Sequence, residues 1–463
     1  MVPFQKPLSI FFILVAVALL LGAYHFTAQQ IIAVLVFLLV ICGTLFYWQF
    51  RLAFAYGGIA LLLATHLLDI RHVIEFAGLD IILFLVGMMI LIGFMEEKHF
   101  FEYLIARVVD RIGKRPYLLM AVMICLAALT SALVGEVVSI LFMLSAMFHL
   151  CRRYGINPIP FLLMLVFATN IGSSATAIGN PIGIMIAMRG HLTFVDFLRW
   201  AFPIALVLLI LSIPVCFLWF GSSLREIEKN MREERTAVNE AGEMIHKKGD
   251  IRLCWILFIG TVLGLVFHAS FEKLLGLEKN TLLLATALLA GSVVLFIERG
   301  DARSFFTRRV DWWTLAFFMA LFASIGTLEY VGVTQRIAEG MAAVGRHDET
   351  LLLIVFSGTI SLLTGFLDNV LAVAAFIPIL HSLEDTGVYT YPFWWGMLFG
   401  GTLFGNLTVI GSTANIVAMG MLEQEFKKHI PFMEWFKPGL LISLLTLVLA
   451  LFLLYCEIPL MPR

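Results

Sequence analysis

Two acidic residues stand in the middle of long apolar stretches, where water is not expected to reach them. Glu136 lies within the segment 116–150, and Asp368 lies within 350–382. An ionised side chain at membrane depth costs about 2.5–3.5 kcal/mol on insertion scales, so it is a candidate for handling a proton or a cation. Removal from water also favours the uncharged form of a carboxyl group, which brings proton exchange within reach. The alternative is a structural carboxylate that accepts hydrogen bonds from nearby backbone.

Small and polar residues interrupt two further apolar segments, 158–188 and 391–420. Their hydroxyl and amide oxygens can coordinate Na⁺, and helix ends beside them can hold an anion. The expected ligands are Thr169, Asn170, Ser173, Ser174, Thr176 and Asn180 in the first segment, and Asn406, Thr408, Ser412, Thr413 and Asn415 in the second, with Asn369 beside Asp368. The alternative is that small residues there merely let helices pack closely.

The composition indicates that most of the chain lies in a lipid membrane rather than in water. Of 463 residues, 61% are hydrophobic and 14% are charged, where soluble proteins carry about 45–50% and about 25%. Most of the chain is therefore expected to face lipid. A net charge of −1 without a basic tract argues against nucleic-acid binding, and the six scattered cysteines suggest neither a disulfide framework nor a metal site.

Apolar runs between charged breaks predict the helices that must position these groups. A membrane-spanning helix needs about 20 residues, and single spans are expected at 8–26, 29–49, 52–68, 79–95, 199–220, 253–270, 280–298, 312–330 and 438–456. The segments 116–150 and 350–382 have apolar arms of about 14 residues, or about 21 Å, which predicts re-entrant hairpins with tips near the midplane. The segments 158–188 and 391–420 are predicted to be broken helices inside the protein, since non-helical backbone cannot face lipid.

The two halves of the chain repeat the same pattern. TAIG at 176–179 recurs as TVIG at 408–411, Glu136 and Asn369 lie 233 residues apart, and Asp80 and Asp311 lie 231 apart. Five crossings per half would insert the halves in opposite orientations. We expect an all-α polytopic membrane protein with two inverted repeats, each of five transmembrane helices and one re-entrant hairpin, plus one extra N-terminal helix. The expected parts are 1–28 for that helix, 29–220 and 253–463 for the repeats, and 221–252 for a cytoplasmic linker.

Basic residues predict the orientation. On this topology 23 of the 31 Lys and Arg residues fall on the side of the N-terminus and eight fall on the other. Because cytoplasmic loops carry an excess of Lys and Arg, we expect a multi-pass cell-membrane protein with a cytoplasmic N-terminus and its C-terminus on the opposite side. The segments 97–112 and 330–346, which mix charged with apolar residues, are expected along the membrane interfaces.

Three motifs resemble a known family. GTLFGNLTVIGSTANIV at 401–417 resembles the second-repeat signature of the ion transporter superfamily, in the branch of arsenite permeases, NhaD-type sodium/proton antiporters and citrate transporter-like proteins. TGFLDNVLAVAAFIPI at 364–379 is similar to that branch's second hairpin, with Asp368 and Asn369 in its Asp-Asn positions. TNIGSSATAIGNPIGIMI at 169–186 resembles the first-repeat motif.

Two departures from the family pattern bear on the substrate. The first hairpin has Gly135-Glu136 where the antiporter branch commonly has Asp-Asn, and Asn180 replaces an Asp that is usual after Gly179. One carboxylate is thus shifted by a position and another is neutralised, so a sodium stoichiometry does not transfer from any one branch.

The function expected from these residues is secondary active transport by alternating access. Two carboxylates at one centre favour a cation, or a weakly charged solute exported against protons, since like charges repel; the alternative is sodium-coupled uptake of a di- or tricarboxylate or of sulfate. The expected cofactor set is empty apart from possible sodium ions, held by Asn170, Asp368, Asn369 and Asn415. The expected partners are the lipid bilayer and a small inorganic ion or small anion, and a homodimer is left open. An intramembrane enzyme would need a motif such as HExxH, which is absent from the sequence, and a passive channel would not need two hairpins in opposite orientations.

Overall fold

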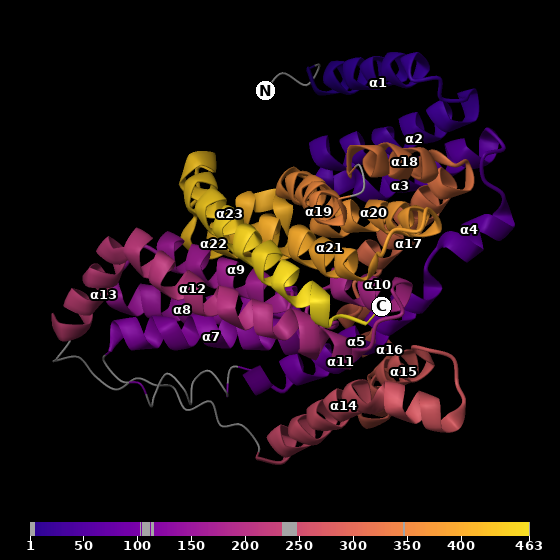
Figure 1. Ribbon diagram of the computed structural model, residues 1–463. Coiled ribbons are helices and arrows are strands. Elements are labelled where there is room, and N and C mark those ends of the chain that lie inside the picture. The colour runs from indigo at the N-terminus through magenta and orange to yellow at the C-terminus, as the bar shows by residue number, and fades with distance from the viewer. Residues whose placement is uncertain are drawn as a thin grey trace. The chain divides into compact units, whose positions relative to one another are not determined.

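The computed structural model describes residues 5–101, 103, 112, 115–233, 248–345 and 348–462. Every regular element in those residues is a helix (Figure 1). Nine of the described helices are long and apolar enough, by length and composition, to cross a membrane. The expected all-α polytopic class is confirmed. Most of the segment 97–112 and the centre of the linker 221–252 lie outside the described residues, so both expectations stay predictions.

The helices form two compact units, and each unit takes residues from both halves of the sequence. Unit 1 comprises Met1–Val86, Gly300–Leu352 and Ala374–Thr390, and unit 2 comprises Gly87–Arg299, Leu353–Val373 and Tyr391–Arg463. The helices α5 (Leu79–Glu97), α19 (Glu349–Phe366) and α20 (Asn369–Asp385) pass from one unit into the other. Units built in this way cut across the predicted repeats rather than dividing the chain at its middle.

Unit 1 is built around α17, which packs against α2, α3 and α4. Leu62, Leu67 and Leu328 lie in one buried cluster of this unit. Its helices are α1 (Gln5–Ala23), α2 (Ala28–Phe46), α3 (Arg51–Ala64), α4 (Ile70–Phe76), α16 (Ala302–Arg309), α17 (Trp312–Tyr330) and α18 (Val333–Gly345). The N-terminus of α2 shows why it begins where it does, because Thr27 and Gln30 form a reciprocal capping box there.

Unit 2 is built around α9, all of whose residues are buried. The other helices that lie wholly in it are α7 (Pro116–Val134), α8 (Glu136–Tyr154), α10 (Pro181–Arg189), α11 (Phe194–Asp196), α12 (Phe202–Trp219), α13 (Gly221–Glu233), α14 (Lys248–Leu275), α15 (Thr281–Ile297), α21 (Tyr391–Leu403), α22 (Thr413–Phe426) and α23 (Phe432–Glu457). Residues 392–403 of α21 are buried as well. Both segments expected to be broken helices are thus enclosed by protein, as their polar content requires.

The helices α7 and α8 form a hairpin that reverses at Gly135. This glycine has φ 98°, which suits a residue without a side chain. The hydroxyls of Thr130 and Ser139 lie 2.6 Å apart across the hairpin, and Ser139 also donates to the Ala127 carbonyl at 2.9 Å. The reversal therefore brings the two arms into direct contact close to the tip.

The arms of this hairpin are longer than the 14 residues expected. Each has 19 residues, or about 28 Å at 1.5 Å per residue, so arm length alone does not restrict the tip to the midplane. The polar residues that suggested an early break do not interrupt the helix, because their hydroxyls find carbonyl partners. Thr130 donates to Leu126 of its own helix at 2.7 Å, and Ser131 donates to Thr169 at 2.7 Å.

The two broken helices have the same local design. The helix α9 ends at Ser173, and α10 begins at Pro181 after a non-helical stretch. The helix α21 ends at Leu403, and α22 begins at Thr413 after two 3₁₀ turns. Proline suits the first position of a helix, because its missing N–H would have had no helical partner there.

The packing of α9 on α7 leaves no room for a side chain at Gly172. A Cβ at this position would lie 2.2 Å from the Ala128 carbonyl oxygen, whereas nothing lies within 4 Å of a Cβ at Gly260 in α14. We expect Gly172→Ala to lower the free energy of unfolding by about 1–3 kcal/mol through overpacking, and Gly260→Ala to leave it unchanged or raise it. Thermal melting of both variants in detergent checks this, and equal melting temperatures would contradict the close packing.

Candidate functional site

Glu136 is placed by the hairpin tip, where it is the first residue of α8 and only 2% exposed. Its backbone N–H donates to the Gly179 carbonyl at 2.9 Å, which ties the tip to the break between α9 and α10. Its Oε1 accepts from the Ser412 hydroxyl at 3.3 Å. Its Oε2 is buried and has no hydrogen-bond partner among the described residues. One oxygen of this carboxylate is thus held by a hydrogen bond, and the side chains of Asn369 and Ser173 lie near enough to interact with the carboxylate as well.

Asp368 lies between α19 and α20, directly before α20, in the segment predicted to be the second hairpin, and is 6% exposed. Its Oδ1 accepts from the Val370 N–H at 3.0 Å, and its Oδ2 accepts from the Thr413 hydroxyl at 3.3 Å. Thr413 is the residue after Ser412, so the two carboxylates, one from each hairpin, reach adjacent residues at the start of α22. They are close enough for the charge of Asp368 to act on Glu136.

Three buried asparagines join the two broken helices beside the carboxylates. The Asn170 amide nitrogen donates to the side-chain oxygens of Asn406 at 2.7 Å and Asn415 at 2.9 Å. Asn415 in turn donates to two carbonyls of the 3₁₀ turns, Gly405 at 2.7 Å and Thr408 at 2.8 Å. All three asparagines are fully buried, and their bonds hold the two non-helical stretches together.

Ser412 links this asparagine cluster to Glu136. Its hydroxyl lies 3.1 Å from the Asn170 Oδ1 and 3.3 Å from the Glu136 Oε1, yet it carries one proton and can donate to only one of them at a time. The same oxygen accepts from the Ala414 N–H at 3.2 Å, which caps α22. The state of Glu136 is therefore connected to the asparagine cluster through a single hydroxyl group.

Asn180 and Ser173 hold the break in the first broken helix through side-chain hydrogen bonds. Asn180 caps α10, since its side-chain oxygen accepts from the Gly183 N–H at 2.8 Å, and its amide donates to the Ser173 hydroxyl at 2.9 Å. Ser173 donates to the Asn170 carbonyl at 3.0 Å, and Ser174 donates to Ile171 at 2.7 Å within the last turn of α9. These side chains close the end of one helix and the start of the next.

Two threonines fasten each broken helix to its own hairpin. Thr176 donates to the Ala132 carbonyl in α7, and Thr408 donates to the Gly365 carbonyl in α19 at 2.7 Å. The two donors are 232 residues apart and the two acceptors are 233 apart. The same bond thus recurs at the offset that the sequence repeat predicts.

Several polar atoms around the carboxylates have no partner in the described part of the chain, although burial without a hydrogen bond is costly. Besides Glu136 Oε2, they include Thr169 Oγ1, Thr364 Oγ1, Asn369 Nδ2 and Asn406 Nδ2. Together they offer oxygens to a cation and amide N–H groups to an anion. In contrast, the described residues contain no group of three His, Cys, Asp or Glu side chains that would hold a transition metal.

Four helices begin at this site. Glu136 starts α8 and contacts Gly179, just before α10, while Asp368 precedes α20 and contacts Thr413 at the start of α22. A helix N-terminus carries about +0.5 of an elementary charge. These four ends therefore offset the two carboxylates when both are ionised, and they leave a positive field when the carboxylates are neutralised.

Hydrogen bonds join seven of the predicted residues into one network: Glu136, Asn170, Ser173, Asn180, Asn406, Ser412 and Asn415. Asp368 bonds to Thr413, whereas the hydroxyls of Ser174, Thr176 and Thr408 bond to backbone carbonyls. Sequence reasoning missed two neighbours. Trp435 of α23 donates its indole N–H to the Asn406 carbonyl at 3.1 Å, and nothing distinguishes this tryptophan from the other eight in the sequence. Thr364 was a visible signal, because it stands among the polar residues at the centre of the second hairpin.

The asparagine cluster can be tested by stability. We expect Asn170→Ala to lower the free energy of unfolding by about 1–3 kcal/mol, because it leaves the buried Asn406 and Asn415 oxygens without their donor. The control is Asn157→Ala, since Asn157 makes one exposed contact, with Lys428 at 3.3 Å. Melting curves in detergent provide the measurement, and a stable Asn170 variant would show that the cluster does not hold the broken helices together.

Comparisons with known proteins agree with this architecture. A family model described as "Citrate transporter" matches residues 44–400 and 271–462. An uncharacterised transporter of Mycobacterium tuberculosis is 32% identical over 375 residues, which are 80% of this chain and 84% of that protein. An uncharacterised transporter of Synechocystis is 28% identical over 424 residues, covering 86% of this chain and 90% of that protein.

A solved structure shares the fold. The YdaH transporter of Alcanivorax borkumensis, whose crystal structure is described as revealing an unusual topology, superposes with a TM-score of 0.58 over 87% of this chain and 89% of that chain, at 14% identity. The resemblance to the ion transporter superfamily, in its citrate transporter-like branch, is thereby confirmed. The chain is a multi-pass membrane transporter and belongs to the citrate transporter family.

Proposed function

We propose that the protein is a secondary active transporter that exchanges H⁺ or Na⁺ for a second small ion, with Glu136 and Asp368 carrying the coupling ion. The observation that carries this proposal is the meeting of two buried carboxylates, from separate hairpins, at the adjacent residues Ser412 and Thr413. Groups of this kind are retained at membrane depth chiefly where they serve transport.

Competition for the same oxygens explains how exchange would work. Two ionised carboxylates in a site of low dielectric repel each other, and a bound proton or Na⁺ relieves that repulsion. Either ion can occupy Glu136 Oε2, which lacks a protein partner in the described residues. For Na⁺, Asp368 and the side-chain oxygens of Asn170, Asn369 and Asn415 are the proposed further ligands. Binding of one ion would then release the other.

The bonds between hairpins and broken helices support alternating access. Thr176 bonds the first broken helix to α7, and Thr408 bonds the second to α19. Within each repeat, the broken helix and the hairpin would therefore move together as one rigid body. Transporters of this kind expose a fixed site to each side by moving such bodies against a scaffold. The charge distribution of the loops further leads us to propose that the N-terminus is cytoplasmic and that the C-terminus lies on the opposite side.

A second candidate is sodium-coupled uptake of a di- or tricarboxylate or of sulfate. Two specific observations favour it: four helix N-termini surround the site, and the amide nitrogens Asn369 Nδ2 and Asn406 Nδ2 have no partner among the described residues. With both carboxylates neutralised by cations, these groups would favour an anion. The description of the matching family as citrate transporters points the same way.

A reconstitution experiment separates the two candidates. Purified protein in vesicles with an internal pH dye receives Na⁺, Li⁺, arsenite, sulfate and dicarboxylates in turn. Exchange predicts proton movement with Na⁺ or Li⁺ alone, or with arsenite under a proton gradient. A response that needs Na⁺ and an anion together would contradict exchange and support coupled uptake.

If Glu136 and Asp368 carry the coupling ion, replacing either carboxylate with an uncharged amide should stop coupled transport. We expect Glu136→Gln and Asp368→Asn each to abolish ion-coupled transport in these vesicles, because the amide cannot release a proton or neutralise a cation, while membrane insertion and melting temperature are retained. Glu272→Gln is the matched control: Glu272 is 4% exposed but caps α15 by accepting from the N–H groups of Asn280 and Leu282.

The control fixes how the result is interpreted. Loss of transport in the two site variants, with normal transport in the Glu272 variant, would assign coupling to Glu136 and Asp368 rather than to buried acids in general. Full transport in both site variants would reduce these carboxylates to structural groups.

A further inference from the structure

A short basic helix in unit 1 has no role in the transport site described above. The helix α16 carries Arg303, Arg308 and Arg309, and its sequence ARSFFTRR places two phenylalanines among them. Phe305 is fully buried, whereas Arg303 and Arg308 are exposed. The helix thus anchors one face in the protein and turns a cationic face outward.

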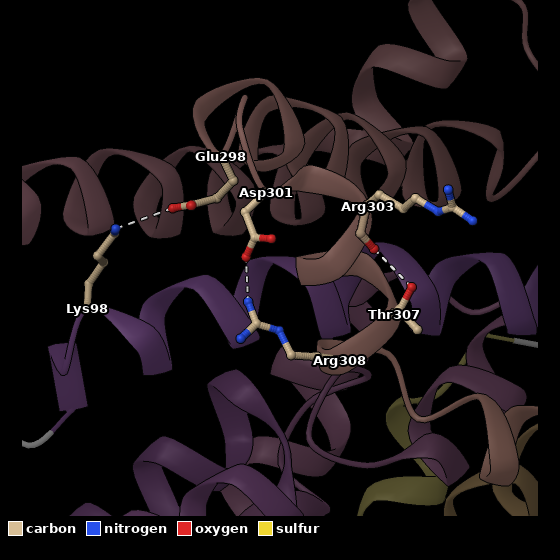
Figure 2. Close-up of polar contacts among 6 residues, drawn as sticks. All are labelled: Lys98, Glu298, Asp301, Arg303, Thr307 and Arg308. Carbon is tan, nitrogen blue, oxygen red and sulfur yellow. Dashed lines mark hydrogen bonds and ion pairs between the residues drawn. The ribbon is translucent and has the colours of Figure 1, made fainter.

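The cationic face borders a pocket. Its volume is about 430 Å³, and it is lined by Gly300, Asp301, Arg303, Ser304, Thr307 and Arg308. Arg308 forms an ion pair with Asp301 at 2.5 Å, and Thr307 donates to the Arg303 carbonyl at 2.9 Å. Figure 2 shows that the Arg303 guanidinium is directed away from the Asp301–Arg308 pair. Two arginines against one aspartate leave the pocket with a positive charge.

The residues that follow place this pocket beside a membrane surface. Trp312 and Trp313 begin α17, a candidate membrane span, and they are 40% and 49% exposed. Tryptophan is enriched where a spanning helix meets the lipid headgroups. Phe306 packs against Trp312 with ring centroids 5.1 Å apart, so α16 is held next to the start of that candidate span.

We propose that this pocket binds the headgroup of an anionic phospholipid. The Arg308 guanidinium, the Ser304 hydroxyl and the Arg303 guanidinium, once its exposed side chain turns toward the pocket, would donate hydrogen bonds to the phosphodiester oxygens. Guanidinium groups suit phosphate in a bidentate arrangement. The acyl chains would lie along the apolar start of α17, beside the exposed indoles. A free phosphate ion would make only the first set of contacts, so the tryptophans favour a lipid over an inorganic anion.

Lipid binding to the purified protein tests the proposal. Native mass spectrometry in detergent measures the affinities for phosphatidylglycerol and for phosphatidylcholine with the same acyl chains. We expect the wild type to prefer phosphatidylglycerol, and Arg303→Gln to weaken its binding by about fivefold, the usual contribution of one basic residue at an anionic surface. Asp301→Asn removes the negative charge from the pocket and is expected to strengthen binding by a similar factor.

The controls separate this site from general attraction. Arg225→Gln removes an exposed arginine of α13 that donates to the Gly221 carbonyl of its own helix, and it is expected to leave lipid preference unchanged. Equal effects of Arg225→Gln and Arg303→Gln would overturn the proposal, as would unchanged binding in Asp301→Asn. Displacement of phosphatidylglycerol by millimolar inorganic phosphate, with no preference over phosphatidylcholine, would also overturn it by assigning the pocket to a free anion.

Discussion

Backbone that leaves a helix within a membrane protein must still satisfy its hydrogen bonds, and the centre of unit 2 is arranged around this requirement. The stretches after α9 and α21 give up helical bonds at depth, where water is scarce. Side chains of the same stretches replace them: Asn180 and Ser412 cap the next helices, and Asn415 donates to two carbonyls of its own turn. The polar residues proposed as ion ligands are therefore also those that satisfy the non-helical backbone.

Because the same polar residues serve the backbone and the candidate site, the sequence alone could predict the residues of the site. Polar residues in an apolar segment are costly, so their positions identify segments that belong in the interior. Asn170 and Asn406 are each predicted to be site residues on these grounds, while their 2.7 Å contact is a finding of the structure. The membrane class followed from composition in the same direct way, because apolar content depends on no tertiary detail.

Other features depended on contacts that no local pattern records. The helix α7 continues past Ser131, whose hydroxyl donates to the Thr169 carbonyl, 38 residues away. A polar residue with a distant partner resembles a helix break when only the sequence is considered. The approach of Trp435 to Asn406 is equally non-local. The division into two units, each drawing on both halves, is also a property of packing rather than of sequence order.

The two carboxylates are not equivalent positions of the repeat. The residue that matches Glu136 at the repeat offset is Asn369, and Asp368 matches Gly135. Glu136 is thus the first residue of its helix, while Asp368 precedes its helix and accepts from that helix's own backbone. One carboxylate already has a backbone donor, and the other has an oxygen without a partner among the described residues. Under the proposed exchange, two ions entering this site would therefore meet unequal affinities. Under that proposal the repeat would supply the symmetry that alternating access needs, and this offset of one residue would supply an order of binding and release.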